Sequence, residues 1–258
     1  MNASVKKFIR TVQTSFPFLL DLKFAAMRKY RKLRGIPFER DFEALALFPA
    51  PKDALYLDIG ANRGQSTEAI LMKTASGPIQ QFEPNPLLCE KLTGLYGSNP
   101  RVTTNSFGLA DVASDRTLYV PFYKNWMFDG LASFDASHAG SWLKGRVYFY
   151  KDEHVKLRET KCRIRRLDEF NLKPFFMKLD IQGYEFFALK GGEQTIKSNE
   201  PILLIESPPE DEIVNYLKGF GYVMYAFREG KFFPGQAGSH NTFFMTPAKA
   251  ALVKAHIQ

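Results

Sequence analysis

Short apolar runs alternate with longer amphipathic stretches over most of this 258-residue sequence. The apolar runs have the length of buried strands, and the stretches between them have the length and periodicity of helices. This alternation is typical of a mostly parallel β-sheet with helices on both faces. The expected strands are residues 54–59, 78–83, 101–109, 175–181 and 202–206, and the expected helices are residues 65–73, 86–96, 184–198 and 210–220.

Two more strand-like runs, residues 222–227 and 242–245, are joined by a glycine-rich loop with no crossover helix. Parallel neighbours need a crossover, so we expect these two strands to be antiparallel. The predicted fold is therefore α/β, with a Rossmann-like sheet that is mostly parallel and has an antiparallel last strand. Gly191 and Gly192 weaken the helix predicted around them.

Residues 111–160 interrupt the alternation and are rich in aromatic side chains, Trp126 and Trp142 among them. They lack helical periodicity, so we predict an insertion of loops and short strands, followed by a short strand at residues 161–165 and a short helical turn at residues 167–170. Aromatic rings stack on sugar faces, but they also fill lids and the interfaces of homo-oligomers. Both interpretations stay open.

The formal net charge of +8 is concentrated at the start of the chain. Residues 1–35 hold nine bases and one acid, and the remainder holds 26 of each. The body is therefore neutral, and no nucleic-acid partner is expected. The two cysteines, Cys89 and Cys162, are far apart and form no metal-binding pattern. They indicate a reducing, cytoplasmic location.

Residues 1–50 are predicted to be a basic helical N-terminal extension, and residues 51–258 the main domain. Apolar residues recur at helical spacing on either side of Pro17. The apolar run at residues 16–24 is too short and too charged for a signal peptide or a membrane-spanning helix. Two interpretations stay open: peripheral contact with anionic lipid at the inner membrane surface, or packing on the domain or a partner subunit.

A glycine-rich bend, with Gly60, Asn62 and Gly64, follows the first expected strand. Glycines let a ligand approach the backbone, and the next helix offers free N–H groups. Asp58 places a carboxylate in an apolar strand, which costs free energy unless something binds it. The second strand ends at Glu83, an acid able to accept hydrogen bonds from both hydroxyls of a ribose.

The bend differs from the G-x-G-x-x-G pattern of dinucleotide-binding folds. Asn62 replaces the middle glycine, and Gln65 replaces the third. The close approach to a pyrophosphate is therefore missing. A nucleoside cofactor without phosphates, S-adenosylmethionine, fits better than NAD. The alternative is a plain strand–turn–helix with a chance acid.

Several segments, in order, resemble motifs of the FkbM family of methyltransferases. The resemblance spans roughly residues 54–247 and implies a class I methyltransferase that uses S-adenosylmethionine, usually an O-methyltransferase acting on sugars or on glycosylated and polyketide products. The matching segments are DIGANRGQST (58–67), QFEPNP (81–86), FMKLDIQGYEFFALKGG (176–192) and PILLIE (201–206), with weaker matches at GLAD (108–111) and RRLDEF (165–170).

The same resemblance assigns residues to the cofactor. It implies that the bend and the FEPNP segment, with Glu83 and Pro84, line S-adenosylmethionine, and that Asp111 lies near the adenine. The sequence departs from the family at Gln182, where a glutamate is common. A mechanism that needs a carboxylate at this position is therefore not supported.

Methyl transfer to a hydroxyl requires alignment of the reacting atoms and a nearby base. Asp180 ends the strand next to the first one, so we expect it to act as general base or to orient the acceptor; the alternative is that it caps the turn at Gly183. Glu206 and then His240 are the next candidates. Asp180, Glu185 and Glu206 could converge on Mg²⁺, but no tight ligand spacing requires it, and no metal is predicted.

Four other functions compete. Asn62 and Gln65 argue against a nucleotide-dependent oxidoreductase. An RNA methyltransferase is disfavoured by the neutral body and by residues 180–183, which replace the usual base-binding tetrad. A non-catalytic nucleoside-binding module and a methyltransferase of another small molecule also stay open. The sequence therefore predicts an S-adenosylmethionine-dependent O-methyltransferase whose acceptor is a sugar, glycan or glycolipid.

Overall fold

The structure is a computed structural model that describes residues 3–16, 18–128, 130, 132–134, 136, 145 and 147–258. The chain forms two compact units, which are described separately below: Met1–Leu33 with Asp115–Cys162, and Arg34–Ser114 with Arg163–Gln258. The predicted division at residue 50 stays a prediction. Trp142 and several of its neighbours in the predicted insertion lie outside the described residues.

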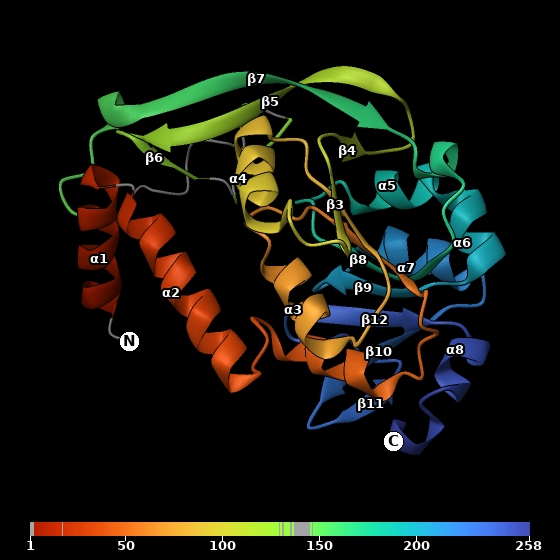
Figure 1. The fold of residues 1–258 in the computed structure, drawn as a ribbon. Helices are drawn as coiled ribbons and strands as arrows, with labels where there is room; N and C mark the ends of the chain where they lie inside the picture. Colours follow the sequence, from red (N-terminus) through yellow and green to blue (C-terminus); the bar gives the residue numbers. More distant parts are fainter. Residues whose placement is uncertain are drawn as a thin grey trace. The chain divides into compact units, whose positions relative to one another are not determined.

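The larger unit contains an eight-stranded sheet in the order β11-β10-β12-β9-β8-β1-β2-β3 (Figure 1). The five strands from β9 to β3 are parallel, whereas β12 is antiparallel to both of its neighbours. This confirms the predicted Rossmann-like fold. The strands are β1 (Leu55–Ile59), β2 (Ile79–Phe82), β3 (Val102–Asn105), β8 (Pro174–Leu179), β9 (Ile202–Glu206), β10 (Val223–Arg228), β11 (Lys231–Pro234) and β12 (Asn241–Met245).

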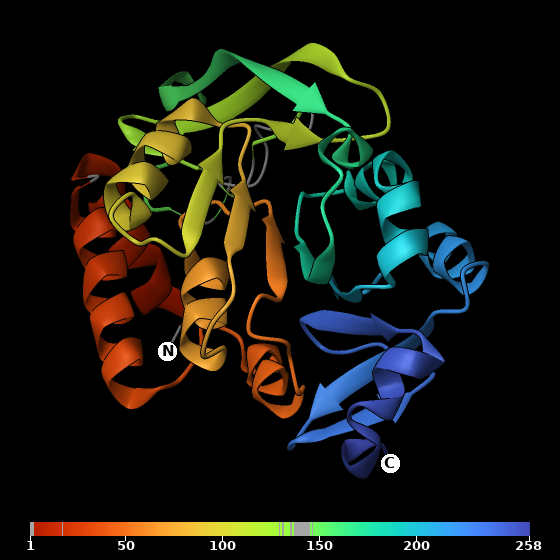
Figure 2. The ribbon, with the colours of Figure 1, turned by 45° about the vertical axis from the view of Figure 1, so that its right-hand side comes forward.

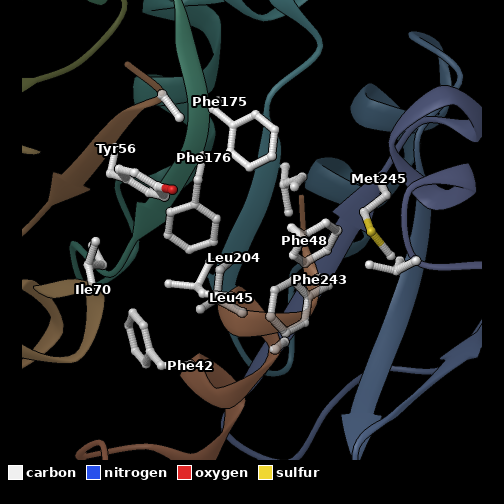
Figure 3. Packing of buried hydrophobic residues seen from close by; sticks show 14 of the residues in the cluster. Phe42, Leu45, Phe48, Tyr56, Ile70, Phe175, Phe176, Leu204, Phe243 and Met245 are labelled. Atoms are coloured by element: carbon white, nitrogen blue, oxygen red, sulfur yellow. The ribbon is translucent and has the colours of Figure 1, made fainter. Parts of the chain in front are cut away.

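Successive side chains of the central strands enter two different cores, because side chains alternate across a strand. In β1, Tyr56 belongs to one core and Leu57 to the other, and Phe176 and Met177 of β8 repeat this division. Figure 3 shows the first core, where these aromatic rings meet Phe42 from the segment that precedes β1. Both faces of the sheet are therefore buried, as the continuous apolar runs predicted.

Helices cover both faces of this sheet (Figures 1 and 2). Residues of η1, α3 and α8 pack in the first core, and residues of α5, α6 and α7 in the second. The predicted helices at residues 65–73 and 86–96 are confirmed with the same bounds. The helices are η1 (Arg40–Leu47), α3 (Gln65–Lys73), α4 (Pro86–Tyr96), η4 (Leu167–Phe170), α5 (Glu185–Gly191), α6 (Glu193–Asn199), α7 (Asp211–Lys218), α8 (Pro247–Ala251) and η5 (Lys254–His256).

Two predicted elements of the larger unit are wrong in their continuity. The helix expected over residues 184–198 is two helices, α5 and α6, which meet at Gly192. A Cβ on Gly191 would lie 2.1 Å from the carbonyl oxygen of Ala110, so the backbones touch there. The strand expected over residues 101–109 is also divided, because β4 (Gly108–Leu109) leaves the large sheet and pairs with the last two residues of β7 (Val155–Arg165). Strand β11 was not predicted.

The smaller unit contains two helices, α1 (Ala3–Ser15) and α2 (Phe18–Arg34), as the N-terminal periodicity predicted. Pro17, the predicted break, lies outside the described residues. Strands β5 (Ser114–Tyr123), β6 (Trp126–Met127) and β7 (Val155–Arg165) belong to a four-stranded sheet in the order β4-β7-β5-β6, and η3 (Asp152–His154) precedes β7.

The prediction of only loops and short strands for residues 111–160 is wrong. Strands β5 and β7 have 10 and 11 residues, and the short strand expected at residues 161–165 is the end of β7. Most side chains of β7 are exposed, so no apolar run marks it in the sequence. Tyr123, Trp126 and Phe128 are buried with Leu20 of α2 in a small core. These aromatic residues therefore have a structural role in their own unit.

Candidate functional site

The carboxyl ends of four neighbouring parallel strands meet at one edge of the large sheet. Ile59 of β1 is paired with Phe82 of β2 and with Leu179 of β8, and Leu179 is paired with Ile205 of β9. The predicted bend, Glu83, Asp180 and Glu206 follow these positions directly or within a residue or two. Ligands of open α/β sheets bind at such carboxyl ends. The register therefore brings most of the predicted site residues to one place.

The bend after β1 requires glycine at its first position. Gly60 and Gly64 have φ angles of +86° and +80°, and Asn62 has +48°. A Cβ on Gly60 would lie 2.0 Å from the backbone oxygen of Asp180. The bend is therefore in contact with the backbone of Asp180, the predicted acceptor-binding residue that follows β8.

Glu83 connects the ends of β1 and β2. Its Oε2 accepts a hydrogen bond from the backbone N–H of Asn62 at 2.9 Å, and its Oε1 accepts one from the N–H of Asn85 at 2.9 Å. The side chain is buried. Glu83 therefore fixes the backbone of the bend and the backbone at the start of α4.

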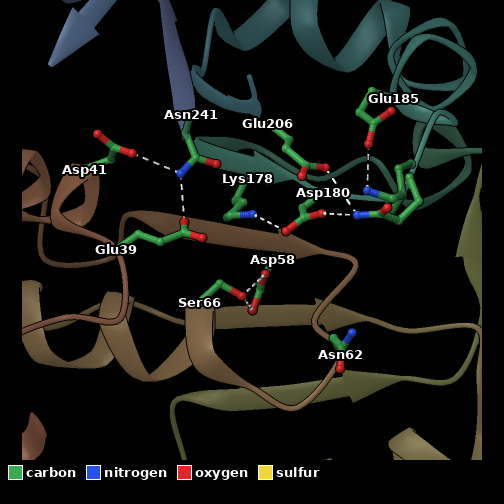
Figure 4. A network of polar contacts seen from close by, with 12 residues as sticks. Glu39, Asp41, Asp58, Asn62, Ser66, Lys178, Asp180, Glu185, Glu206 and Asn241 are labelled. Carbon is green, nitrogen blue, oxygen red and sulfur yellow. Dashed lines mark hydrogen bonds and ion pairs between the residues drawn. The ribbon is translucent and has the colours of Figure 1, made fainter. Parts of the chain in front are cut away.

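Asp58 is fully buried and is bound by side chains of the protein. It accepts a hydrogen bond from the hydroxyl of Ser66 at 2.7 Å (Figure 4) and another from the hydroxyl of Thr67 at 2.5 Å. Burial raises the pKa of Asp58 in opposition to these hydrogen bonds. The first turn of α3 therefore supplies the partner that the sequence analysis sought in a ligand. Direct contact of Asp58 with a cofactor stays a prediction.

An acidic pair with a buried lysine lies at the ends of β8 and β9 (Figure 4). The Nζ of Lys178 lies 3.0 Å from the Oδ2 of Asp180, and the lysine is almost fully buried. The amide of Gln182 donates to Asp180 Oδ1 and to Glu206 Oε2, both at 3.3 Å. The glutamine that departs from the expected motif therefore joins the two carboxylates.

The two acids have opposite pKa shifts. Burial alone would raise the pKa of Asp180, but the charge of Lys178 and its hydrogen bonds outweigh burial and lower it. Desolvation and the negative charge of Asp180 raise the pKa of Glu206 to about 7. Burial would lower the pKa of Lys178, but the surrounding carboxylates, Asp180 foremost, raise it. At neutral pH this arrangement keeps Asp180 ionised and lets Glu206 exchange a proton.

Glu185 binds the turn that follows Asp180. Its two carboxylate oxygens accept hydrogen bonds from the backbone N–H groups of Ile181, at 2.7 Å, and Gly183, at 2.9 Å. Glu185, rather than Asp180, therefore binds the N–H of Gly183. Within the part of the chain that the structure describes, no cluster of three or more His, Cys, Asp or Glu side chains could hold a metal ion.

The family model described as the methyltransferase FkbM domain matches residues 58–224, which include the bend, Glu83, Asp180 and Glu206. The chain belongs to the FkbM methyltransferase family. This membership makes it a methyltransferase, as predicted. The sheet agrees with the class I methyltransferase fold, because β12 runs antiparallel between β9 and β10.

This FkbM-family chain is also similar, at low sequence identity, to individual proteins and solved structures. Over 165 residues it is 28% identical to the AMB antimetabolite synthetase AmbE of Pseudomonas aeruginosa; this match covers 55% of the chain and 8% of that protein's length. The FkbM methyltransferase structure from Methylobacillus flagellatus has a TM-score of 0.49 at 16% identity, covering 81% of this chain and 46% of the other. An rRNA methylase from Streptococcus thermophilus has a TM-score of 0.43 at 11% identity, covering 81% and 94%. The assignment rests on the family match and the strand order.

His240, the third catalytic candidate of this FkbM-family chain, is exposed. Its backbone oxygen accepts a hydrogen bond from the N–H of Ser207 at 2.8 Å, and its ring Nδ1 lies 3.2 Å from the hydroxyl of Ser239. The next residue, Asn241, donates to Glu39 at 2.7 Å and to Asp41 at 3.0 Å. Sequence analysis did not single out these three residues, because 200 positions separate Asn241 from Asp41.

The structure also places the two remaining cofactor candidates. Pro84 follows Glu83, and a Cβ on Gly108 would lie 3.4 Å from its side chain. Asp111 is half-buried just after β4, and its backbone nitrogen lies near Gly191 of α5. Contact of either residue with the cofactor stays a prediction.

Proposed function

We propose that this FkbM-family enzyme transfers a methyl group from S-adenosylmethionine to a hydroxyl of a sugar, glycan or glycolipid. One observation carries the proposal: Glu206, whose pKa is about 7, is hydrogen-bonded to the same amide as Asp180 at the sheet edge that holds the bend. A hydroxyl acceptor must lose a proton, and a base with a pKa near the working pH is the most efficient.

The residues at the bend fit the proposed cofactor. Glu83 is buried beside Asn62 at the end of the second strand, the position from which an acid accepts hydrogen bonds from ribose hydroxyls in nucleotide-binding sheets. Gly60 and Gly64 let the bend pack closely against Asp180 and Tyr96, which fixes its shape. S-adenosylmethionine would supply an activated methyl group on its sulfonium. The bend and Glu83 would hold its nucleoside, with Pro84 and Asp111 beside it.

Each acidic residue then has its own role. The charge of Lys178, 3.0 Å away, keeps Asp180 ionised, so Asp180 orients the acceptor hydroxyl as a hydrogen-bond acceptor. The negative charge of Asp180 raises the pKa of Glu206, so Glu206 accepts the hydroxyl proton as general base. The amide of Gln182 donates a hydrogen bond to both carboxylates and so fixes their positions relative to each other.

A second candidate is methylation of another small molecule. The AmbE relative from Pseudomonas aeruginosa is named as an antimetabolite synthetase, and the match covers only a small part of it. A segment similar to this chain within a protein of that name favours a small biosynthetic product as acceptor. The neutral charge of residues 36–258 makes an RNA acceptor the weaker alternative.

The test is transfer of a labelled methyl group from S-adenosylmethionine to three acceptor fractions: glycolipids, soluble small molecules and RNA. We expect label in the glycolipids or in the sugars of the small-molecule fraction. Glu206→Gln should lower transfer by about 100-fold because it removes the base. Glu212→Gln, an exposed change on α7, should leave transfer unchanged.

Calorimetry with S-adenosylmethionine and its demethylated product separates the outcomes. Donor binding with label only in RNA or in non-sugar small molecules would overturn the acceptor class. Absence of donor binding would overturn the whole proposal, including the role of Glu83.

A further inference from the structure

Helix α2 has two apolar faces, of which only one packs against protein. Leu20 is buried and Phe24 is partly buried in the small core of this unit. The opposite face carries four large apolar side chains that are all at least 60% exposed. At about 100° per residue they fall within an arc of about 120°. They are Phe18, Leu22, Tyr30 and Leu33, and we call them the α2 stripe.

Exposed apolar side chains also extend from α1 and from a nearby turn. Phe8 of α1 is largely exposed, and Phe149 is 91% exposed at a backbone φ of +53°. Thr11 joins the helix to the turn, because its hydroxyl accepts a hydrogen bond from the N–H of Tyr148 at 2.8 Å. Large exposed apolar side chains gathered in one unit mark an interaction site. The turn packs Val147 into the small core while it presents Phe149 to solvent.

The charge of the same segment identifies the partner. Residues 1–35 carry nine bases and one acid, which equals the net charge of the whole chain. Lys23, Lys29, Lys32 and Arg34 are exposed on or just beyond the helix that carries the stripe. Apolar side chains flanked by lysines are typical of helices that lie in the interface of anionic bilayers, where long basic side chains reach the headgroups.

We propose that α1, α2 and the turn at Phe149 form a surface that docks onto anionic membrane lipid. The α2 stripe inserts among the headgroups and upper acyl chains, and the exposed lysines bind the lipid phosphates. Among the helices that the structure describes, none has both the length and the hydropathy of a membrane span. The proposal does not depend on methyl transfer.

The test uses the full chain and flotation with two kinds of vesicle, phosphatidylcholine alone and phosphatidylcholine mixed with phosphatidylglycerol. We expect binding only to the anionic vesicles and loss of binding at high salt. Leu22→Ser with Leu33→Ser should weaken binding to the vesicles by at least about tenfold, because two side chains that would insert into the bilayer lose their apolar surface. Lys29→Glu with Lys32→Glu should weaken it by a similar factor.

Leu95→Ser, an exposed leucine of α4 in the other unit, is the matched control and should bind like the wild type. Equal vesicle binding by the Leu22/Leu33 variant and the wild type, or no binding by the wild type, would overturn the proposal. So would a wild-type dimer in sedimentation that this variant converts to a monomer, because a second copy would then cover the stripe. Donor calorimetry on the same variants verifies that the other unit is intact.

Discussion

The carboxylate of Glu83 accepts a hydrogen bond from the backbone N–H of Asn62 at 2.9 Å, across 21 positions of sequence. The bond ties the bend after β1 to the end of β2, and a second bond to Asn85 holds the start of α4. One buried acid therefore shapes the bend and faces the proposed ribose site. Two functions in one side chain make this position sensitive to change.

Glu83→Gln should weaken donor binding by about 10- to 100-fold, because it removes the charge from hydrogen bonds worth about 1.5–3 kcal/mol. Calorimetry with the demethylated donor product measures the change. Glu90→Gln, an exposed change on α4, should bind as the wild type does. Unchanged affinity in the Glu83 variant would refute the assigned role.

Substitution of two glycines should have opposite effects on stability. Gly60→Ala places a Cβ 2.0 Å from the Asp180 oxygen at positive φ, and we expect a loss of about 3 kcal/mol in the free energy of unfolding. Gly94→Ala, in helix α4 with nothing within 4 Å of its Cβ, should gain about 0.5–1 kcal/mol. Urea denaturation measures both, and a Gly60 variant as stable as the wild type would contradict the contact.

Lys178→Met should destabilise the fold by about 3 kcal/mol, because it leaves the Asp180 carboxylate without its buried partner. Adding Asp180→Asn should restore part of this loss. The exposed Lys197, paired with Glu193, provides the control: Lys197→Met should change stability by less than about 0.5 kcal/mol. Equal losses of stability in Lys178→Met and Lys197→Met would show that burial does not make the Lys178–Asp180 ion pair more important for stability.

The rate of methyl transfer should rise with pH through about 7, the pKa of Glu206, because the general base must be ionised. The pKa of Glu206 is raised above its ordinary value of 4.5, so the folded protein binds this proton more tightly than the unfolded chain does. The contribution of Glu206 to the free energy of unfolding is therefore lost as pH rises through about 7. Initial rates at saturating donor, measured across this pH range, follow the rise. Glu206→Gln should abolish the rise in rate, and a rise that persists in this variant would show that another group is the base.

Much of the larger unit could be predicted because its strands are buried on both faces. Their continuous apolar runs, such as β9, are visible in the sequence, and a proline and a glycine mark the start of α4 and the end of β1. The exposed strand β7 and the short β11 have no such signal. The break between α5 and α6 depends on contact of Gly191 with Ala110, which no local pattern reveals.

The sequence alone determined the Rossmann-like fold, the family and the carboxyl-end position of Glu83, Asp180 and Glu206, because periodicity and motif order are local properties. Only the tertiary structure decided how these acids differ. The charge of Lys178 lowers the pKa of Asp180, and the charge of Asp180 helps to raise the pKa of Glu206 to about 7. Burial and the distance between charges set these pKa values, and both depend on the tertiary structure. Likewise, exposure of the α2 stripe is known only once the opposite face of the helix is packed.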